Sequence, residues 1–492
     1  MSVVVASYVQ LHSNILEPDP SRVVPRLVVP FEDRPTSHQR TEELVSRLKA
    51  LSVDETETLI EDVLARFSPN HVDLNETLVA HARIVDSILE EHSYRDNNQE
   101  LLVGAAFTAE YAPEAVAVCN PSAVRHPDQK DLPPGSLRVA MSARAIGEGH
   151  ISSICFYEAI VTAEAWTFVP PTEQLSLGTI EDGRSRRELL DLVVDGYHRR
   201  ADMATTIGGE KQALLARNSL VDEEIEAFRE WRRHALAQDS RVARSHAEDR
   251  LYMARFSPTT ELDQRILLPE ANDEAHGLED LRLVEFIAPD GSTEYRGCYT
   301  AFDGKMAVPQ LMTSGNLREF EIHSLTGPAT ADKGLALFPR TINGQHLAIT
   351  RADWQNIALA RSDDGYFWKT SDVLYRPQQP WEIVKTGNCG SPIELDEGWL
   401  VITHGVGTMR RYSFGALLLD KTNPDRVLAT LTSPLITTEG SQNDGYVPNA
   451  IYSCGGLLYD GTLWLPFSES DKRVRIASVP IQELLSNMTP IS

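Results

Sequence analysis

The stretch HGLEDLRLV, residues 276–284, places two carboxylates side by side and an arginine two positions later, among leucine and valine. Side chains of a β-strand alternate between its two faces, so we expect Asp280 and Arg282 on one face and Glu279 on the other. The two carboxylates would then not form an acid–base pair. A cation beside Asp280 favours its ionised form, so these residues could be a structural ion pair or the proton donor of an enzyme.

Further basic and polar side chains occur next to Gly or Pro in short stretches between β-rich runs. Taken singly, each of these cations could be a solvated surface charge, and His404 could be a hydrogen-bonded core residue. Their joint occurrence in loops that flank strands favours one shared pocket. The candidates are Asn120, Arg144, Glu148, His150, Lys333, Arg340, Arg351, Glu394, His404, Arg410, Arg411, Tyr412, Tyr446, Asn449 and Asp471.

The elements that must position these residues are mostly strands. Residues 101–165 and 250–492 consist of short β-rich runs separated by Gly, Asp, Asn and Pro, as in all-β folds. Similar β runs repeat along the chain, and the last three of them recur about every 55 to 60 residues. A repeat of about 50 residues, enough for one small sheet, is typical of the blades of a propeller. We therefore predict a mainly β protein with a five-bladed β-propeller over residues 101–492. A β-sandwich with additions is the alternative.

Two tracts of the chain have a helical period instead. Apolar residues at helical spacing in residues 37–92 predict an N-terminal helical domain, residues 1–100. Ser52 and Glu55 have the spacing of a capping box at the start of its second helix. A charged helical tract predicts a helical insertion in the propeller at about residues 180–247. Such additions often serve oligomerisation, so we expect a homo-oligomer.

Composition limits the classes of partner. The chain has 492 residues, of which 71 are acidic and 46 basic, and its formal charge of −25 repels nucleic acid and anionic membranes. No run approaches the roughly 18 apolar residues of a membrane span, and the first residues lack the features of a secretory signal, so we expect a cytoplasmic protein. The five cysteines are scattered without a CxxC pair. We predict that they are buried apolar residues and that the protein binds no metal.

The stretches GLEDLR, LFPRTING, GWLVITHGV and VPN follow one another in this order along the chain. Through them the chain resembles, over residues 101–492 apart from the helical insertion, glycoside hydrolase family 130, the mannoside phosphorylases and their hydrolytic relatives. The family fold is a five-bladed β-propeller, in agreement with the number of repeats. The NPSAV, HPDQ and RAIGEGHISS stretches, with the N-terminal extension, are similar to a longer branch of the family.

The resemblance implies that Asp280 is the general acid, because it matches the Asp of the family's Glu-Asp element. The family's acid passes a proton through a mannose hydroxyl to the glycosidic oxygen. Inorganic phosphate attacks the anomeric carbon from the opposite face, with inversion. This relay would remove the need for Asp280 to touch the leaving oxygen.

Other matches to the family pattern imply the binding residues. His404 and Lys333 are supported most directly, and Asp471 matches an Asp that lines the family's pocket. Ser413 stands where many members have an arginine that contacts phosphate, and Arg410 and Arg411 are close enough in sequence to replace it. The expected substrate- and phosphate-binding residues are Asn120, Arg144, Arg282, Lys333, Arg340, Arg351, His404, Arg411, Tyr412, Asn449 and Asp471.

One acid with several cations favours phosphorolysis. An inverting hydrolase needs a second carboxyl group about 6.5–9.5 Å from the first, whereas phosphate needs only cations to hold it. We therefore expect an inverting β-mannoside phosphorylase that uses a β-mannoside and inorganic phosphate, forms mannose 1-phosphate and requires no cofactor. The alternatives are an inverting β-mannosidase, with Glu148, Glu394 or Glu439 as base, and a carbohydrate-binding propeller without activity.

Overall fold

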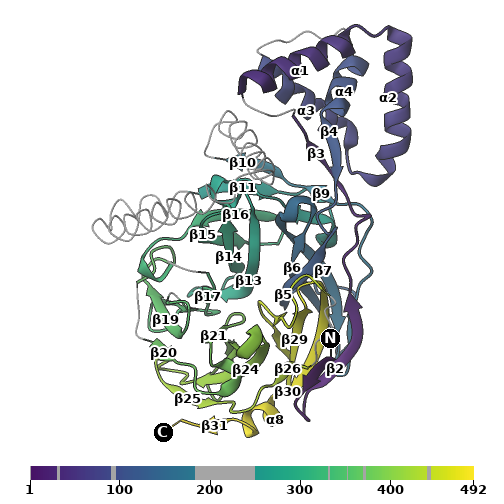
Figure 1. Ribbon diagram of the computed structural model, residues 1–492. Coiled ribbons are helices and arrows are strands. Elements are labelled where there is room, and N and C mark those ends of the chain that lie inside the picture. The colour runs from purple at the N-terminus through teal and green to yellow at the C-terminus, as the bar shows by residue number, and fades with distance from the viewer. Residues whose placement is uncertain are drawn as a thin grey trace.

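The computed structural model describes residues 2–29, 34–89, 96–182, 250–330, 333–351, 353–369, 373–439 and 445–491. Figure 1 shows helices from the N-terminal part of the chain gathered at one end of the molecule, next to a larger body of strands. The mainly β class is therefore confirmed, whereas the number of blades stays a prediction. The helical insertion predicted at about residues 180–247 lies outside the described residues, apart from residues 180–182, which end the strand β10 (Thr179–Asp182).

The predicted helical period is borne out in the N-terminal region. The predicted capping box is confirmed, because the Glu55 N–H donates to Ser52 Oγ at 3.3 Å and the Ser52 N–H donates to Glu55 Oε2 at 2.8 Å. These bonds satisfy backbone donors that the first turn of a helix leaves without partners. The helices are α1 (Arg34–Lys49), α2 (Val53–Phe67), α3 (Leu74–Leu89) and α4 (Asn97–Ala106).

The helices pack through buried apolar side chains. Ile60 of α2, Leu78 of α3 and Leu101 of α4 belong to one cluster. Gly104 lies where α4 crosses α3, and a Cβ atom at this position would be 1.9 Å from the backbone oxygen of Leu78. The close approach of the two helix backbones therefore depends on the missing side chain of Gly104.

Residues 2–16, which we predicted within the helical domain, contain two strands of the β body. β1 (Ser2–Val5) pairs with β26 (Ile436–Glu439), and β2 (Gln10–Leu16) pairs with β30 (Arg473–Pro480). Figure 1 shows β2 beside the C-terminal strands. Strands from the two ends of the described chain thus share a sheet. The helices are connected to this body by a short ribbon of β3 (Val24–Leu27) and β4 (Thr108–Tyr111).

From Ala117 onward the strands form successive antiparallel meanders. The first meander consists of β5 (Ala117–Arg125), β6 (Leu137–Ile146), β7 (Ser152–Val161) and β8 (Trp166–Phe168), and the second of β13 (Gly277–Ile287), β14 (Thr293–Phe302), β15 (Ala307–Ser314) and β16 (Glu319–Ser324). The third consists of β17 (Ala336–Leu337), β18 (His346–Thr350), β19 (Ile357–Ser362) and β20 (Val373–Tyr375), and the fourth of β21 (Lys385–Asn388), β23 (Trp399–Val406), β24 (Tyr412–Leu419) and β25 (Val427–Thr430). The last consists of β27 (Ile451–Tyr452), β29 (Thr462–Glu469), β30 and β2.

Shorter elements extend these sheets. Figure 1 shows α8 near the C-terminus, next to the last strands. The additional elements are β9 (Ser176–Leu177), β11 (Arg250–Arg255), β12 (Arg265–Leu267), β22 (Ile393–Glu394), β28 (Leu457–Tyr459), α8 (Ile481–Ser486) and β31 (Thr489–Pro490).

Apolar clusters lie between each meander and the next. One joins the β5–β8 meander to β13–β16, another joins β13–β16 to β17–β20, and a third joins β17–β20 to β21–β25. A further cluster joins β21–β25 to the meander of β29 and β30, which in turn packs on β6 and β7 of the first meander. The last meander therefore packs on the first. The cysteines are buried without disulfides, as predicted.

No helix in the part of the chain that the structure describes combines the length and the apolar character needed to cross a membrane.

We expect Gly104→Ala to lower the free energy of unfolding by about 1–3 kcal/mol, because the new methyl group collides with backbone atoms that cannot rotate away. This loss should exceed the gain of about 1 kcal/mol from the higher helix propensity of alanine. Urea unfolding followed by circular dichroism measures the difference. Gly315→Ala is the control, since a Cβ atom there would have no atom within 4 Å. Equal losses in the two variants would contradict the packing argument.

Candidate functional site

The first strands of two meanders carry a β-bulge at residues that the sequence analysis selected. In β13 the register against β14 shifts after Glu279, and Asp280 has a φ of 57°. In β5 the register against β6 shifts after Cys119, and Asn120 has a φ of 50°. Asp and Asn tolerate this left-handed conformation better than most residues, and bulges re-aim side chains. Both polar side chains are thereby turned out of the normal strand alternation.

The bulge in β13 brings Glu279 and Asp280 to the same cation. Arg144 Nη2 is 2.8 Å from Glu279 Oε1, and its Nη1 is 3.7 Å from Asp280 Oδ1. Lys333 Nζ is 3.3 Å from Glu279 Oε2. The prediction that the two carboxylates face opposite sides is therefore wrong, because the extra residue of the bulge breaks the two-residue period of the strand.

The carboxyl group of Asp280 is buried, with 6% of the residue exposed, and accepts a hydrogen bond of 2.6 Å from Asn120 Nδ2. Burial alone would raise its pKa. The charges of Arg144, Arg282 and Lys333 act in the opposite direction, as does the hydrogen bond from Asn120. These interactions hold the pKa of Asp280 below its usual value, so the side chain is ionised at neutral pH.

Arg282 contacts the backbone of Asp280 and not its carboxylate. Its Nη1 donates to the main-chain oxygen of Asp280 at 3.0 Å, and its Nε donates to the main-chain oxygen of Cys389 at 3.1 Å. Its Nη2 donates to the hydroxyl of Tyr452 at 2.8 Å. The buried guanidinium thus ties β13 to the segment after β21 and to β27, and it fixes the backbone at the bulge.

His404 of β23 lies fully buried among aromatic rings and cations. Its ring centroid is 5.9 Å from that of Tyr412 and 4.9 Å from that of Tyr452. Burial lowers the pKa of His404 well below its usual value, and the charges of Arg351 and Lys385 lower it further. The imidazole is therefore neutral, and its Nε2 accepts a hydrogen bond of 3.3 Å from Arg351 Nη1.

Lys385 is a cation that the sequence analysis missed. It begins β21 and is buried, and its Nζ lies 4.6 Å from the ring centroid of Trp354, within the range of a cation–π interaction. Its charge, like that of Arg351, lowers the pKa of His404. The Gly-rich KTGNCG stretch could have drawn attention to it, since such stretches let backbone and ligand approach closely.

Asp471 is linked to Asp280 through two neutral side chains. Ser468 Oγ is 2.9 Å from Asn120 Oδ1 and 3.3 Å from Asp471 Oδ1. Burial raises the pKa of Asp471 to about 6; the negative charge of Asp280 adds to this effect, and Arg144 opposes it. Asp471 therefore lies close to Asp280. No feature of the sequence identified Ser468.

Three residues at the start of β24 were also considered in the sequence analysis. Tyr412 stacks on His404, and its N–H donates to the main-chain oxygen of Asn449 at 3.1 Å. Arg411 is exposed and follows the short 3-10 turn Thr408–Arg410 between β23 and β24. Ser413, in the position of the family's arginine, is buried and bonded to Thr437.

Arg340 does not join the cations around Asp280 and His404. Its Nη2 and Nε are 2.7 and 2.9 Å from the two carboxylate oxygens of Glu394. Pro339 and Glu394 line a different cavity of about 370 Å³, formed by the C-terminal parts of β5 and β13. The ion pair with Glu394 therefore accounts for the charge of Arg340.

The expected single acid has carboxyl neighbours. Glu279 and Asp471 both lie close to Arg144, so the site contains three carboxyl groups and not one. The carboxylates that we considered as bases of a hydrolase lie elsewhere. Glu394 is paired with Arg340, while Glu148 and Glu439 are exposed, in the turn before β7 and at the end of β26.

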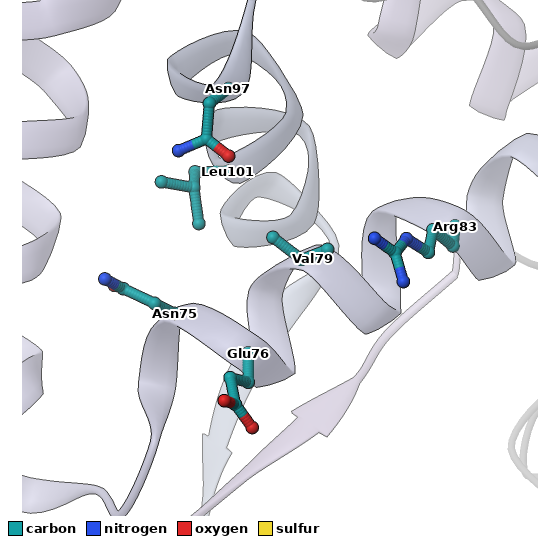
Figure 2. Close-up of a pocket in the computed structure, with 6 residues that line it drawn as sticks. All are labelled: Asn75, Glu76, Val79, Arg83, Asn97 and Leu101. Atoms are coloured by element: carbon teal, nitrogen blue, oxygen red, sulfur yellow. The ribbon is translucent and has the colours of Figure 1, made fainter.

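A second hollow lies in the helical region. It has a volume of about 430 Å³, and Figure 2 shows its lining side chains on α3 and α4. None of the predicted site residues lines it. The lining residues are Asn75, Glu76, Val79, Arg83, Asn97 and Leu101.

We expect Arg144→Met to lower the free energy of unfolding at neutral pH by about 2–4 kcal/mol, because two carboxylates lose their shared cation. Asp280 has a lowered pKa in the folded state, so its contribution to stability is present above the usual value of 3.8 and is lost as the pH falls below it. The deficit of the variant should therefore shrink at acidic pH. Urea unfolding at pH 7 and at about pH 2.5, below the usual pKa of the carboxyl group, measures both values.

Arg138→Met on the same strand is the control for this experiment. The carboxylates nearest to Arg138 are 3.9 Å away, and the loss should stay below about 1 kcal/mol. A deficit at Arg144 that does not depend on pH would contradict the electrostatic account.

Comparison with known proteins agrees with the resemblance. The family model described as beta-1,4-mannooligosaccharide phosphorylase matches residues 256–489. A 1,2-beta-oligomannan phosphorylase of Thermoanaerobacter sp. (strain X514) is 31% identical over 228 residues, which are 45% of this chain and 75% of that protein. A beta-1,2-mannobiose phosphorylase of the same organism is 28% identical over 245 residues, 49% of this chain and 77% of that protein.

Among solved structures, the beta-1,2-mannobiose phosphorylase from Listeria innocua in complex with beta-1,2-mannobiose has a TM-score of 0.45 and 17% identity, over 76% of this chain and 92% of that one. The family model and the relative at 31% identity decide the assignment. This chain belongs to glycoside hydrolase family 130.

Proposed function

We propose that this chain is an inverting β-mannoside phosphorylase, which cleaves β-mannosyl di- or oligosaccharides with inorganic phosphate and forms mannose 1-phosphate. The observation that carries the proposal is the buried carboxylate of Asp280 with the charges of Arg144, Arg282 and Lys333 around it. Two further cations, Arg351 and Lys385, act on His404. The names of the relatives support a mannoside as the substrate.

The cations of the site would bind the nucleophile, which is inorganic phosphate. Phosphate is already nucleophilic, so it needs charge-assisted hydrogen bonds and no general base. Arg351 and Lys385 lie beside the neutral His404, which can accept or donate a hydrogen bond without adding charge. In a protein with a formal charge of −25, such a local group of cations favours a small anion over a polyanion.

Proton delivery fits a relay through the sugar. Asp280 is ionised in the free protein, so it must take up a proton before it can act as an acid. A bound phosphate dianion would offset the charges of Arg144 and Lys333 and thereby raise the pKa of Asp280. Phosphate binding and protonation of the acid would then be linked. The protonated acid would pass its proton through a mannose hydroxyl to the leaving oxygen, in the way that the family resemblance implies.

The fold that we propose for this activity is a five-bladed propeller. Its support is the series of antiparallel meanders, each packed on the next, with the last packed on the first. Propellers gather residues from all blades around one axis. Asn120, Asp280 and His404 come from the strands β5, β13 and β23 of three such meanders.

The rival function is an inverting β-mannosidase. One observation favours it: Asp471 is a further carboxyl group close to Asp280, and with a pKa of about 6 it can be ionised at neutral pH. An ionised Asp471 could activate water. Its nearness to Arg144, which also contacts Glu279 and Asp280, argues for a structural role within the charged cluster instead.

We expect the purified protein to release mannose 1-phosphate from β-1,2- or β-1,4-linked mannooligosaccharides only when phosphate is present. Asp280→Asn should lower kcat/KM by about 10²- to 10⁴-fold, because the amide cannot supply a proton. Anion-exchange chromatography of the products measures both effects.

Asp290→Asn is the matched control, since Asp290 lies in an exposed turn where it accepts bonds from Ser292. Release of free mannose without phosphate would favour the mannosidase. Sugar binding that persists without any turnover, in the wild type as in Asp280→Asn, would favour a binding protein.

We expect Lys385→Met to raise the KM for phosphate by about 10- to 100-fold, because a buried cation contributes roughly 1.5–3 kcal/mol to the binding of an anion. The KM for the mannoside should change much less. Initial rates with each substrate varied in turn measure the two constants. Lys369→Met is the control, since Lys369 is an exposed residue paired with Asp363. Equal changes in both KM values would count against a phosphate site at Lys385.

A further inference from the structure

The two aspartates of the site are connected by a buried chain of polar contacts. Asp280 Oδ1 accepts a hydrogen bond of 2.6 Å from Asn120 Nδ2, and Asn120 Oδ1 is 2.9 Å from Ser468 Oγ. Ser468 Oγ is also 3.3 Å from Asp471 Oδ1. Asn120 and Ser468 are buried, while Asp471 is partly exposed. The chain therefore runs from the buried Asp280 to the carboxyl group of a partly exposed residue.

The positions of the hydrogen atoms in this chain follow from the donors available. Asn120 must turn its NH2 group to Asp280, because the carboxylate of Asp280 only accepts. The amide oxygen of Asn120 then faces Ser468, whose hydroxyl is 2.9 Å from it and 3.2 Å from the main-chain oxygen of Tyr452. The single hydroxyl proton is assigned to the shorter contact, with Asn120. Any other direction of that proton leaves a buried amide oxygen without a donor, which is unfavourable.

The direction of the Ser468 proton determines which protonation state of Asp471 can complete the chain. With its proton directed to Asn120, Ser468 can only accept a hydrogen bond from the side of Asp471. Two acceptors cannot bond to each other, so Asp471 completes the chain only when it carries a proton itself. Ionisation of Asp471 would turn the Ser468 hydroxyl toward the new carboxylate and remove the donor from Asn120.

We propose that Asp471 is a positioning residue of this site that works in its protonated form, and that it holds the carboxylate of Asp280 through Ser468 and Asn120. The link to catalysis rests on the proposed function. In the protonated state the amide of Asn120 is fixed at both ends, and Asp280 is held for proton transfer. In the ionised state the amide is fixed at one end only.

The charges around Asp471 are consistent with a proton at this position. The groups that face it are Asp280 on β13, Arg144 on β6, Lys333 before β17 and the thiol of Cys119 on β5. Burial and the charge of Asp280 favour the protonated form, whereas Arg144, Lys333 and a hydrogen bond from Ser468 favour the ionised form. Burial is the largest of these effects, and the pKa of Asp471 is about 6. Burial raises the pKa of Cys119 well above its usual value, so that thiol stays neutral.

The first test measures the proton directly and needs no enzymatic activity. Infrared difference spectra of the full-length protein between pH 4.5 and 8 should contain the carbonyl band of a protonated carboxyl group that disappears with a midpoint near pH 6. Asp471→Asn should lose this band, and saturating inorganic phosphate should shift the midpoint upward, because a second anion disfavours ionisation. An Asp471 that is ionised throughout this range would overturn the proposal.

The second test uses the pH dependence of turnover. In the wild type, kcat/KM should fall by about tenfold per pH unit above the midpoint, and the fall in kcat should begin at higher pH, since kcat reports the loaded enzyme. Asp471→Asn can donate to Ser468 at every pH and should lose this alkaline limb. Ser468→Ala should lower kcat and flatten the limb, because it breaks the chain.

Asp460→Asn is the matched control, because Asp460 has the same left-handed backbone, with a φ of 48°, in an exposed turn. Its infrared titration and pH profile should equal those of the wild type. An alkaline limb that persists unchanged in Asp471→Asn would overturn the proposed role. If the infrared band behaves as expected but no mannoside is phosphorolysed, the proton on Asp471 is established and it is the proposed function that fails.

Discussion

The interaction on which this site depends is the contact of one guanidinium, that of Arg144, with two adjacent carboxylates. An isolated buried charge is costly, and its cost is offset only by partners in good geometry. Glu279 is held by Arg144 and Lys333, and Asp280 by Arg144 and Asn120. Because these residues come from separate meanders, the charged group exists only when the strands are assembled. The charged group of the site therefore depends on the packing of the β body.

The bulges make this arrangement possible. A regular strand would place Glu279 and Asp280 on opposite faces, and only one of them could meet Arg144. The left-handed residue at each bulge allows β5 and β13 to present Asn120 and Asp280 to each other. Asn and Asp are among the few residues that accept this conformation easily and also carry the polar groups that the site needs. Asn449 and Asp471 have the same left-handed backbone.

The charged residues around Asp280 lie apart from the ion pair of Arg340 and Glu394. Near Asp280, Arg144 and Lys333 share the carboxylates of Glu279 and Asp280, and His404 is kept neutral by burial and by the charges of two further cations, Arg351 and Lys385. At the cavity formed by the C-terminal parts of β5 and β13, Arg340 and Glu394 form a bidentate pair in which each charge is neutralised by the other. An anion should therefore prefer the region of Asp280, although the whole chain is strongly acidic.

Local patterns in the sequence determined the strand-rich class, the helices of the N-terminal region, the capping box of Ser52 and the burial of the cysteines, since each depends on neighbours in the chain. The motifs also identified Asp280, Asn120 and His404 as residues of interest. Only the tertiary structure decided that Glu279 shares a cation with Asp280, that Arg340 is paired elsewhere, and that Lys385 and Ser468 join the site. It also decided that the first strands pair with the last. The physical reason is that a bulge, a buried charge pair and the pairing of distant strands depend on residues brought together by folding, which the period of a local stretch does not record.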